Sequence, residues 1–197
     1  MKTWSHFLLL TAVALIFQGC ASKHMRPVSP DAVLSYAPSA EESVVIFMRP
    51  SVFGGAIQSS VFDVTTADNV LVGIVSSKTK VAYRVTAGDH LFMVVGESAD
   101  FMKAELLAGK TYYALVTPRM GVWKARFSLR PVHGEELSSD EFKDWESSCE
   151  FVENTESSLQ WAKDNAPSIQ DKREHYFEKW MSKPEEERPV LRKEDGL

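Results

Sequence analysis

Short apolar runs dominate the chain between Ser43 and residue 130. They are rich in Val, Ile, Phe and Tyr, and Gly, Pro, Asp or Asn separates them every eight to twelve residues, a spacing typical of all-β sandwiches and barrels. The pattern predicts strands over residues 43–49, 58–65, 70–76, 80–86, 90–97, 101–107, 111–117 and 122–130. The expected fold is mainly β, an antiparallel β-sandwich of about seven or eight strands over residues 43–133.

Two of these runs also predict which faces of the sheet are covered. Along residues 122–130, apolar side chains alternate with charged or hydroxyl-bearing ones, so one face of that strand should be buried and the other exposed. Residues 91–95 read Leu-Phe-Met-Val-Val without alternation. That strand should therefore lie centrally, with both faces covered.

The pattern changes to a helical period after residue 134. Ser138 with Glu141 fits a capping box, and Leu137 with Phe142 fits a hydrophobic staple, which predicts a helix from Ser139. Pro167 marks a break before a second amphipathic face. We expect a helical extension over residues 134–184, then a charged, flexible tail over 185–197. The helices should pack on the side of the sandwich through four aromatic residues, Phe142, Trp145, Tyr176 and Trp180.

The first nineteen residues have the pattern of an export signal, with Lys2 as a basic start and an apolar run from Phe7 to Phe17. Eleven helical residues extend about 16 Å, too short to span a bilayer core of about 30 Å. Gly19-Cys20 at the end of the run resembles the bacterial lipobox. The resemblance implies cleavage before Cys20 and acyl chains on that cysteine.

Neighbouring residues bear on where such a protein resides. Phe17 and Gln18 depart from the usual lipobox residues, which leaves cleavage by an ordinary signal peptidase as the alternative. Ala21 stands where Asp would resemble an inner-membrane retention signal, so we expect the periplasmic face of the outer membrane in a Gram-negative host. Residues 20–42 contain three prolines and no sustained periodicity, which predicts a flexible tether of about 25 Å that lets the body stand clear of the lipid.

Three separated motifs resemble, in order, those of a family of small bacterial lipoproteins defined by an uncharacterised all-β domain. They are Val45-Ile46-Phe47-Met48-Arg49-Pro50-Ser51, Ala87-Gly88-Asp89-His90 and Ala108-Gly109-Lys110-Thr111-Tyr112-Tyr113. The resemblance covers roughly residues 43–133 and implies a compact β-sandwich and membrane anchoring. It brings no catalytic residue, ligand or partner.

Signals for catalysis, metals and cofactors are weak. With Cys20 lipidated, Cys149 has no partner for an intrachain disulfide and is best interpreted as a small buried residue. The five histidines lack metal-ligand spacing. Gly109-Lys110-Thr111 mimics the end of a phosphate-binding loop, but a strand follows it instead of a helix. We therefore predict no catalytic residue, no metal site and no cofactor.

Charge divides the chain into two unlike parts. Residues 20–133 carry 12 Lys and Arg against 9 Asp and Glu, whereas residues 134–197 carry 9 against 18. With 27 acidic against 22 basic residues in an exported chain, nucleic acid is not an expected partner. If successive strands run antiparallel, one end of the sandwich forms a basic pole. Its residues are Arg49, Lys78, Lys80 and Arg119. Either the acidic helical extension folds back over this pole, or the pole faces anionic headgroups or an acidic envelope partner, and we favour the second because the last strand ends at the opposite pole.

Three classes of function remain open from the sequence. The favoured one is a membrane-anchored envelope lipoprotein that acts without catalysis as a scaffold or partner-binding module. A carbohydrate- or peptidoglycan-binding lipoprotein is the alternative, and it predicts that Phe53 or Trp161 lines a groove. An envelope hydrolase is the third, and it requires a cleft that holds two carboxylates with raised pKa values.

Overall fold

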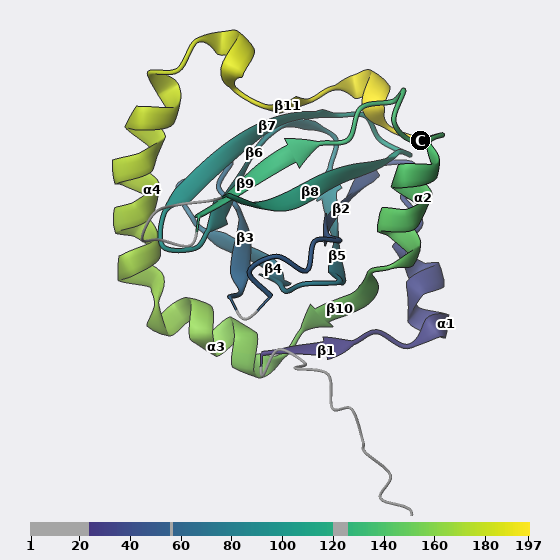
Figure 1. The fold of residues 1–197 in the computed structure, drawn as a ribbon, viewed down its shortest axis with the longest axis horizontal. Coiled ribbons are helices and arrows are strands. Elements are labelled where there is room, and N and C mark those ends of the chain that lie inside the picture. Colours follow the sequence, from purple (N-terminus) through teal and green to yellow (C-terminus); the bar gives the residue numbers. More distant parts are fainter. Residues whose placement is uncertain (1–23, 56, 120–125) are drawn as a thin grey trace, which may run out of the picture.

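The computed structural model describes residues 24–55, 57–119 and 126–197. Within these ranges the fold is mainly β, with eleven strands in two sheets and three longer helices in the carboxyl-terminal third (Figure 1). This confirms the expectation of a mainly β chain with carboxyl-terminal helices. The sheets are mixed, however, and the expectation of purely antiparallel pairing is wrong.

The first sheet contains six strands in the order β1-β10-β5-β2-β8-β9. Their bounds are β1 Met25–Pro27, β10 Glu150–Asn154, β5 Thr79–Thr86, β2 Glu42–Arg49, β8 Thr111–Arg119 and β9 Arg126–Pro131. β2 pairs with β5 in antiparallel fashion and with β8 in parallel fashion. The parallel pair arises because β2 and β8 are separated by six successive chain reversals, and an even number returns the chain to its original direction.

The second sheet contains five strands in the order β11-β7-β6-β3-β4. Their bounds are β11 Val190–Leu191, β7 Ala99–Leu106, β6 Gly88–Val95, β3 Ser59–Asp63 and β4 Val70–Val75. β11 pairs with β7 in parallel fashion, and the other neighbours are antiparallel. The eight strands β2 to β9 correspond one for one to the eight predicted runs, although residues 122–125 of the last run lie outside the described residues.

A shared apolar core joins the two sheets. Phe47 of β2 meets Phe92 of β6 in an edge-to-face contact, with 5.0 Å between ring centroids. Along β6, Phe92 and Val94 lie in this core, whereas Met93 and Val95 face a second cluster on the other side of the strand. β6 is thus covered on both faces, as its unbroken apolar run predicts.

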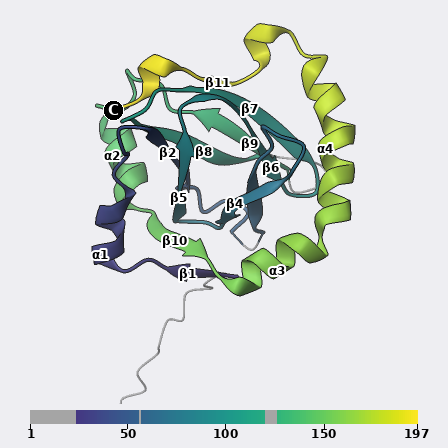
Figure 2. The same cartoon turned by 180° about the vertical axis from the view of Figure 1, so that it is seen from behind.

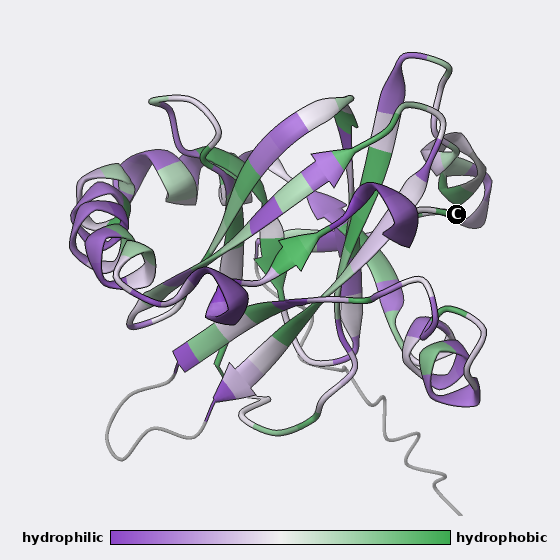
Figure 3. Ribbon diagram, turned by 90° about the horizontal axis from the view of Figure 1, so that it is seen from above, coloured by the Kyte–Doolittle hydropathy of each residue, from purple (hydrophilic) through white to green (hydrophobic). Residues whose placement is uncertain are grey.

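The three longer helices are α2 (Asp140–Ser147), α3 (Glu156–Asp164) and α4 (Ala166–Met181). α2 and α4 lie on opposite flanks with the sheets between them (Figures 1 and 2). Phe142 and Trp145 pack on the outer face of β2 and β8, whereas Tyr176 and Trp180 pack on the second sheet. Figure 3 shows apolar residues concentrated along the strands and polar residues prevailing on the flanking helices. The four predicted docking aromatics therefore divide between two surfaces.

The start of the extension differs in detail from the expectation. The N-cap is Ser139, whose side chain accepts a hydrogen bond from the Phe142 amide, so Ser138 is not the capping residue. The helix ends at Ser147, and the residues that follow form β10, which pairs in parallel fashion with β5. The expected helical extension over residues 134–184 is therefore interrupted here, because residues 150–154 form a strand at the open edge of β5.

Residues 24–42 lie against the body, which differs from the expected tether. Met25 is buried in the core, and β1 pairs with β10. The short helices α1 (Pro30–Val33) and η1 (Leu34–Tyr36) follow, and Arg84 Nη2 donates to the carbonyls of Ser35 and Ala37. The prolines of this segment made the edge strand β1 hard to predict. Proline is nevertheless tolerated in an edge strand, because its missing N–H removes no hydrogen bond between strands.

The final segment is also attached, although its composition predicts a flexible tail. The 3₁₀ turns η2 (Glu185–Glu187) and η3 (Lys193–Asp195) flank β11. Leu191 is buried in the core, and the buried carboxylate of Asp195 accepts hydrogen bonds from the Gly134 and Arg192 amides. The contacts of Leu191 and Asp195 therefore hold this segment on the body, although most of its other residues are charged. Among the described residues, no helix is long and apolar enough to cross a bilayer.

Candidate functional site

The structure brings all four predicted pole residues to one end of the first sheet, because β8, which ends at Arg119, runs parallel to β2, which ends at Arg49. Arg49 ends β2 directly opposite Thr79, and the Lys78 amide donates to the Arg49 carbonyl over 2.8 Å. Arg49 and Lys80 are nevertheless buried, with 0% and 5% of their surfaces exposed, whereas Lys78 is exposed. The pole is therefore not a broad basic surface, because two of its cations point into the protein.

Arg49 is bound from within to the loop that follows it. Its Nη1 donates to the Ile57 carbonyl over 2.6 Å, and its Nη2 donates to the Phe53 and Gly54 carbonyls over 2.9 and 2.8 Å. The guanidinium also lies 4.8 Å from the centre of the Phe127 ring. Burial lowers the pKa of Arg49 because it disfavours the charged form. One buried side chain thus fixes three carbonyl groups of a single loop.

This loop presents apolar side chains to solvent, and we call residues 51–57 the apolar loop; residue 56 is outside the described residues. Val52, Phe53 and Ile57 are 71%, 54% and 44% exposed. The loop backbone is closed by hydrogen bonds from the Gly55 and Ile57 amides to the Val52 and Gly54 carbonyls. Gly54 has a φ of +64°, a conformation that other residues adopt only with strain. The described residues of the loop are therefore held by hydrogen bonds and carry an apolar outer surface.

Lys80 holds the end of α2 in place. Its Nζ donates to the Glu146 carbonyl over 2.7 Å, lies 3.1 Å from the Glu146 carboxylate, and lies 4.4 Å from the centre of the Phe151 ring. Nearby Cys149 is buried and carries a free thiol. Burial raises the pKa of this thiol, so it stays protonated at neutral pH. Both residues stabilise the junction of α2 and β10.

Arg119 contacts a different part of the molecule from the other predicted pole residues. It ends β8, and its Nη2 lies 2.9 Å from Oδ2 of Asp100 on β7. Asp100 is buried, with 6% of its surface exposed. The β8 end therefore bridges to the second sheet, beside the carboxyl-terminal half of α4.

A cluster of polar side chains links the second sheet to β5. Asp63 accepts hydrogen bonds from the Thr65 amide and hydroxyl and from the Tyr83 hydroxyl. His90 Nδ1 lies 3.2 Å from Thr65 Oγ1 and 3.6 Å from Asp63 Oδ2, while Nε2 lies 2.9 Å from the Thr86 carbonyl oxygen. Both ring nitrogens of His90 are therefore occupied by the protein.

The pKa values of this cluster follow from its contacts. Burial alone would raise the pKa of Asp63, but hydrogen bonds from His90 and Thr65 outweigh it and lower that pKa to about 2. The bond to Asp63 raises the pKa of His90 against the opposing effect of burial. Burial, together with the Asp63 charge, raises the pKa of Tyr83 to about 12. The cluster holds Asp63 in its ionised form. The pKa of Asp63 is lowered, whereas the catalytic acid of a hydrolase requires a raised pKa.

The structure bears on two of three further predicted residues, Phe53 and Trp161, and leaves the predicted lipidation of Cys20 untested. Cys20 lies outside the described residues, and the description begins four residues later at His24. The His24 carbonyl accepts a hydrogen bond from Thr155 Oγ1 over 2.8 Å. Because Thr155 is the N-cap of α3, His24 lies at the start of that helix. Of the two aromatics proposed for carbohydrate contact, Trp161 packs against both core clusters, whereas Phe53 is exposed.

No protein family and no curated protein matches this chain in our comparisons. Within the described residues there is also no group of three or more His, Cys, Asp or Glu side chains that could hold a metal ion. The sequence signals the apolar loop through Phe53-Gly54-Gly55 between two strands. The role of Arg49 beneath the loop carries no sequence signal, because its burial depends on contacts that form only in the fold.

Proposed function

We propose that this protein is a membrane-anchored envelope lipoprotein that binds a partner protein, without catalysis, through the apolar loop. The observation that carries the proposal is the support of Val52, Phe53 and Ile57 by buried Arg49. Exposed apolar groups clustered on a fixed backbone are typical of protein interaction sites, and aromatic side chains often supply their main binding contacts. Exposed Lys78 stands on the adjoining turn, where the Ser77 hydroxyl donates to the Ser51 carbonyl. The preferred partner surface is therefore apolar with acidic residues at its rim.

The anchor proposed at Cys20 would hold the body close to the lipid. Cys20 and His24 are four residues apart, a separation that an extended chain spans in at most about 14 Å. Because Met25 is already part of the core, little chain remains to act as a spacer. We therefore propose that the body lies near the periplasmic face of the outer membrane. We also propose that β2 to β9 form a β-sandwich like that of the lipoprotein family.

The proposal is tested with detergent-solubilised envelopes and the full chain, anchor included. We expect the double variant Phe53→Ser and Ile57→Ser to lose most of the partner captured by the wild-type protein, with an unchanged melting temperature because both side chains are exposed. The matched control is Val70→Ser with Leu107→Ser, which changes two apolar residues of similar exposure outside the loop. Equal capture by both double variants would show that the apolar loop is not the binding surface.

The same variants test the carbohydrate-binding alternative, which the exposure of Phe53 keeps open. Aromatic rings stack on sugar rings through their faces. If the wild-type chain sediments with purified peptidoglycan and the loop variant does not, the loop binds carbohydrate and the partner-protein proposal is wrong. We expect neither to sediment with it.

A further inference from the structure

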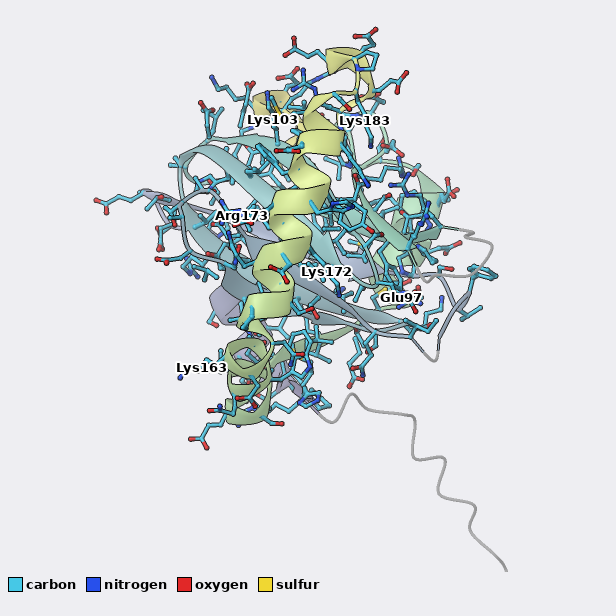
Figure 4. All side chains as sticks on the ribbon, turned by 90° about the vertical axis from the view of Figure 1, so that its left-hand side faces the viewer. Glu97, Lys103, Lys163, Lys172, Arg173 and Lys183 are labelled. Atoms are coloured by element: carbon cyan, nitrogen blue, oxygen red, sulfur yellow. The ribbon has the colours of Figure 1, made fainter. Side chains whose placement is uncertain are left out.

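A cavity of about 360 Å³ lies between α4 and the strand ends beside it, and none of the described residues of the apolar loop lines it. Its walls come from the start of β7, the joined ends of β8 and β9, and the last turns of α4 with the residues just beyond. Figure 4 views α4 from outside, with Lys183 near its carboxyl end and Glu97 beside the helix. The volume is within the range of small-molecule sites.

Four cationic side chains line this cavity against a single carboxylate. The cations are Arg119, Arg126, Lys179 and Lys183, and the carboxylate is Asp100. The lining therefore carries an excess of three positive charges. The positive lining contrasts with the segment that contains α4, because residues 134–197 hold twice as many acidic as basic residues.

The cations come in two like-charged pairs that face the same space. Arg119 and Arg126 are directly opposite each other on the antiparallel strands β8 and β9, an arrangement in which like charges are destabilising. Lys179 lies in the last turn of α4, and Lys183 lies two residues beyond Met181, the last residue of that helix; both line the same cavity, so their like charges also repel. Two unfavourable pairs in one cavity are readily explained if an anion lies between them.

Asp100 forms ion pairs with only two of the four cations that line the cavity. Its buried carboxylate lies 2.9 Å from Arg119 Nη2 and 3.5 Å from Lys183 Nζ. Lys179 Nζ lies 2.7 Å from His175 Nε2 and 5.2 Å from the centre of the Tyr176 ring, contacts that leave its positive charge uncompensated. Arg126 is exposed and makes no ion pair with the residues that the structure describes. Asp100 thus orients two cations, while the other two remain available to a ligand.

We propose that this cavity binds a ligand through a phosphate monoester or diphosphate group. A phosphate monoester carries close to two negative charges near neutral pH, and a diphosphate carries two or more. Either matches the three net positive charges of the lining better than a single carboxylate does. Arginine donates to two phosphate oxygens at once, and lysine contributes a point charge. The remaining volume admits a group about the size of a sugar ring. The site goes beyond the proposed partner binding and does not depend on the lipid anchor.

The test uses the full lipidated chain in a neutral detergent, with pyrophosphate and glycerol phosphate as soluble probes in titration calorimetry. Arg126→Gln with Lys179→Gln removes the two available cations and leaves the Asp100 contacts intact. We expect this variant to bind pyrophosphate at least about tenfold more weakly, since each lost charge-assisted bond is worth a factor of this order. Its melting temperature without ligand should be unchanged or higher, because two repulsive contacts are relieved.

The matched control is Lys143→Gln with Lys163→Gln, which lowers the net charge equally at two exposed residues outside the cavity. It should bind pyrophosphate like the wild type. A second arm uses the Cys20→Ser chain, which lacks the anchor, and measures its sedimentation with phosphatidylcholine vesicles doped with either phosphatidic acid or phosphatidylglycerol; a preference for the monoester lipid that the cavity variant in the same background loses would identify a lipid source. The proposal is overturned if the wild type does not bind the soluble probes at about 1 mM and the Cys20→Ser chain does not bind the monoester lipid, or if the cavity and control variants bind equally. The Phe53 variant should bind phosphate normally, so the two proposals can fail separately.

Discussion

Replacing Arg49 by Lys is expected to destabilise the protein and to release the apolar loop. The guanidinium donates three hydrogen bonds to loop carbonyls from a position with no exposed surface. Hydrogen bonds to charged groups contribute about 1.5 to 3 kcal/mol each, and an ammonium group cannot reproduce the planar donor arrangement of arginine. If Lys keeps two of the three bonds, the free energy of unfolding should fall by about 1.5 to 3 kcal/mol, and if it keeps only one, by about 3 to 6 kcal/mol.

Urea unfolding measures this loss, and amide hydrogen exchange shows where it acts. The Gly55 and Ile57 amides donate within the loop, so their exchange should accelerate more than that of amides in the core strands. Arg84→Lys is the control, because Arg84 also donates to two carbonyls but its side chain is 36% exposed; it should cost less than about 1 kcal/mol. If Arg49→Lys destabilises the protein while loop exchange is unchanged, Arg49 supports the sheets and our account of the loop is wrong.

Four further predictions concern other parts of the molecule. The raised pKa of His90 contributes stability that is complete below its unfolded value of 6.5 and is lost as pH rises through the higher folded value, so His90→Gln should flatten the decline of stability that begins above pH 6.5. The lowered pKa of Asp63, about 2 against 3.8, contributes about 2 kcal/mol that should be lost as pH falls from about 4 to 2, and Asp63→Asn should remove that dependence in acid unfolding. Trp180→Phe should cost less than about 1.5 kcal/mol, because the indole Nε1 makes no hydrogen bond to any described residue, whereas Trp180→Ala should cost about 3 to 5 kcal/mol; chemical denaturation separates the two. Cys149→Ala should cost about 1 to 2 kcal/mol with no dependence on redox conditions, and a native intermolecular disulfide at this residue would contradict that.

The strands of the central module were predictable because their signal is local. Alternating or unbroken apolar runs between turn residues determined β2 to β9 within a few residues, and the run in β6 even indicated that both of its faces are covered. The edge strands β1 and β11 and the short strand β10, which lies between β1 and β5, were missed. Each is only two to five residues long and exists because a partner strand offers it an open edge, which is information that no short window of sequence contains.

For the candidate sites, the sequence could predict where residues lie along the strands, but not which side chains are buried or which contacts they make. The sequence placed Arg49, Lys78, Lys80 and Arg119 at one end of the strands, and the strand register agrees. It did not show that Arg49 and Lys80 are buried, because side-chain burial depends on contacts with Ile57 and Glu146 made after folding. The four-cation cavity was hidden for the same reason, since its two halves are more than fifty residues apart in the chain.

The most direct test of the central claim uses a photo-crosslinking amino acid at residue 53 in living cells. Our account predicts that the anchored chain gives one discrete adduct with an envelope protein, that the same probe at exposed residue 107 does not, and that Cys20→Ser releases the chain from the membrane with loss of the adduct. Identical adducts from residues 53 and 107, or a Cys20→Ser chain that still sediments with membranes after a high-salt wash, would contradict it.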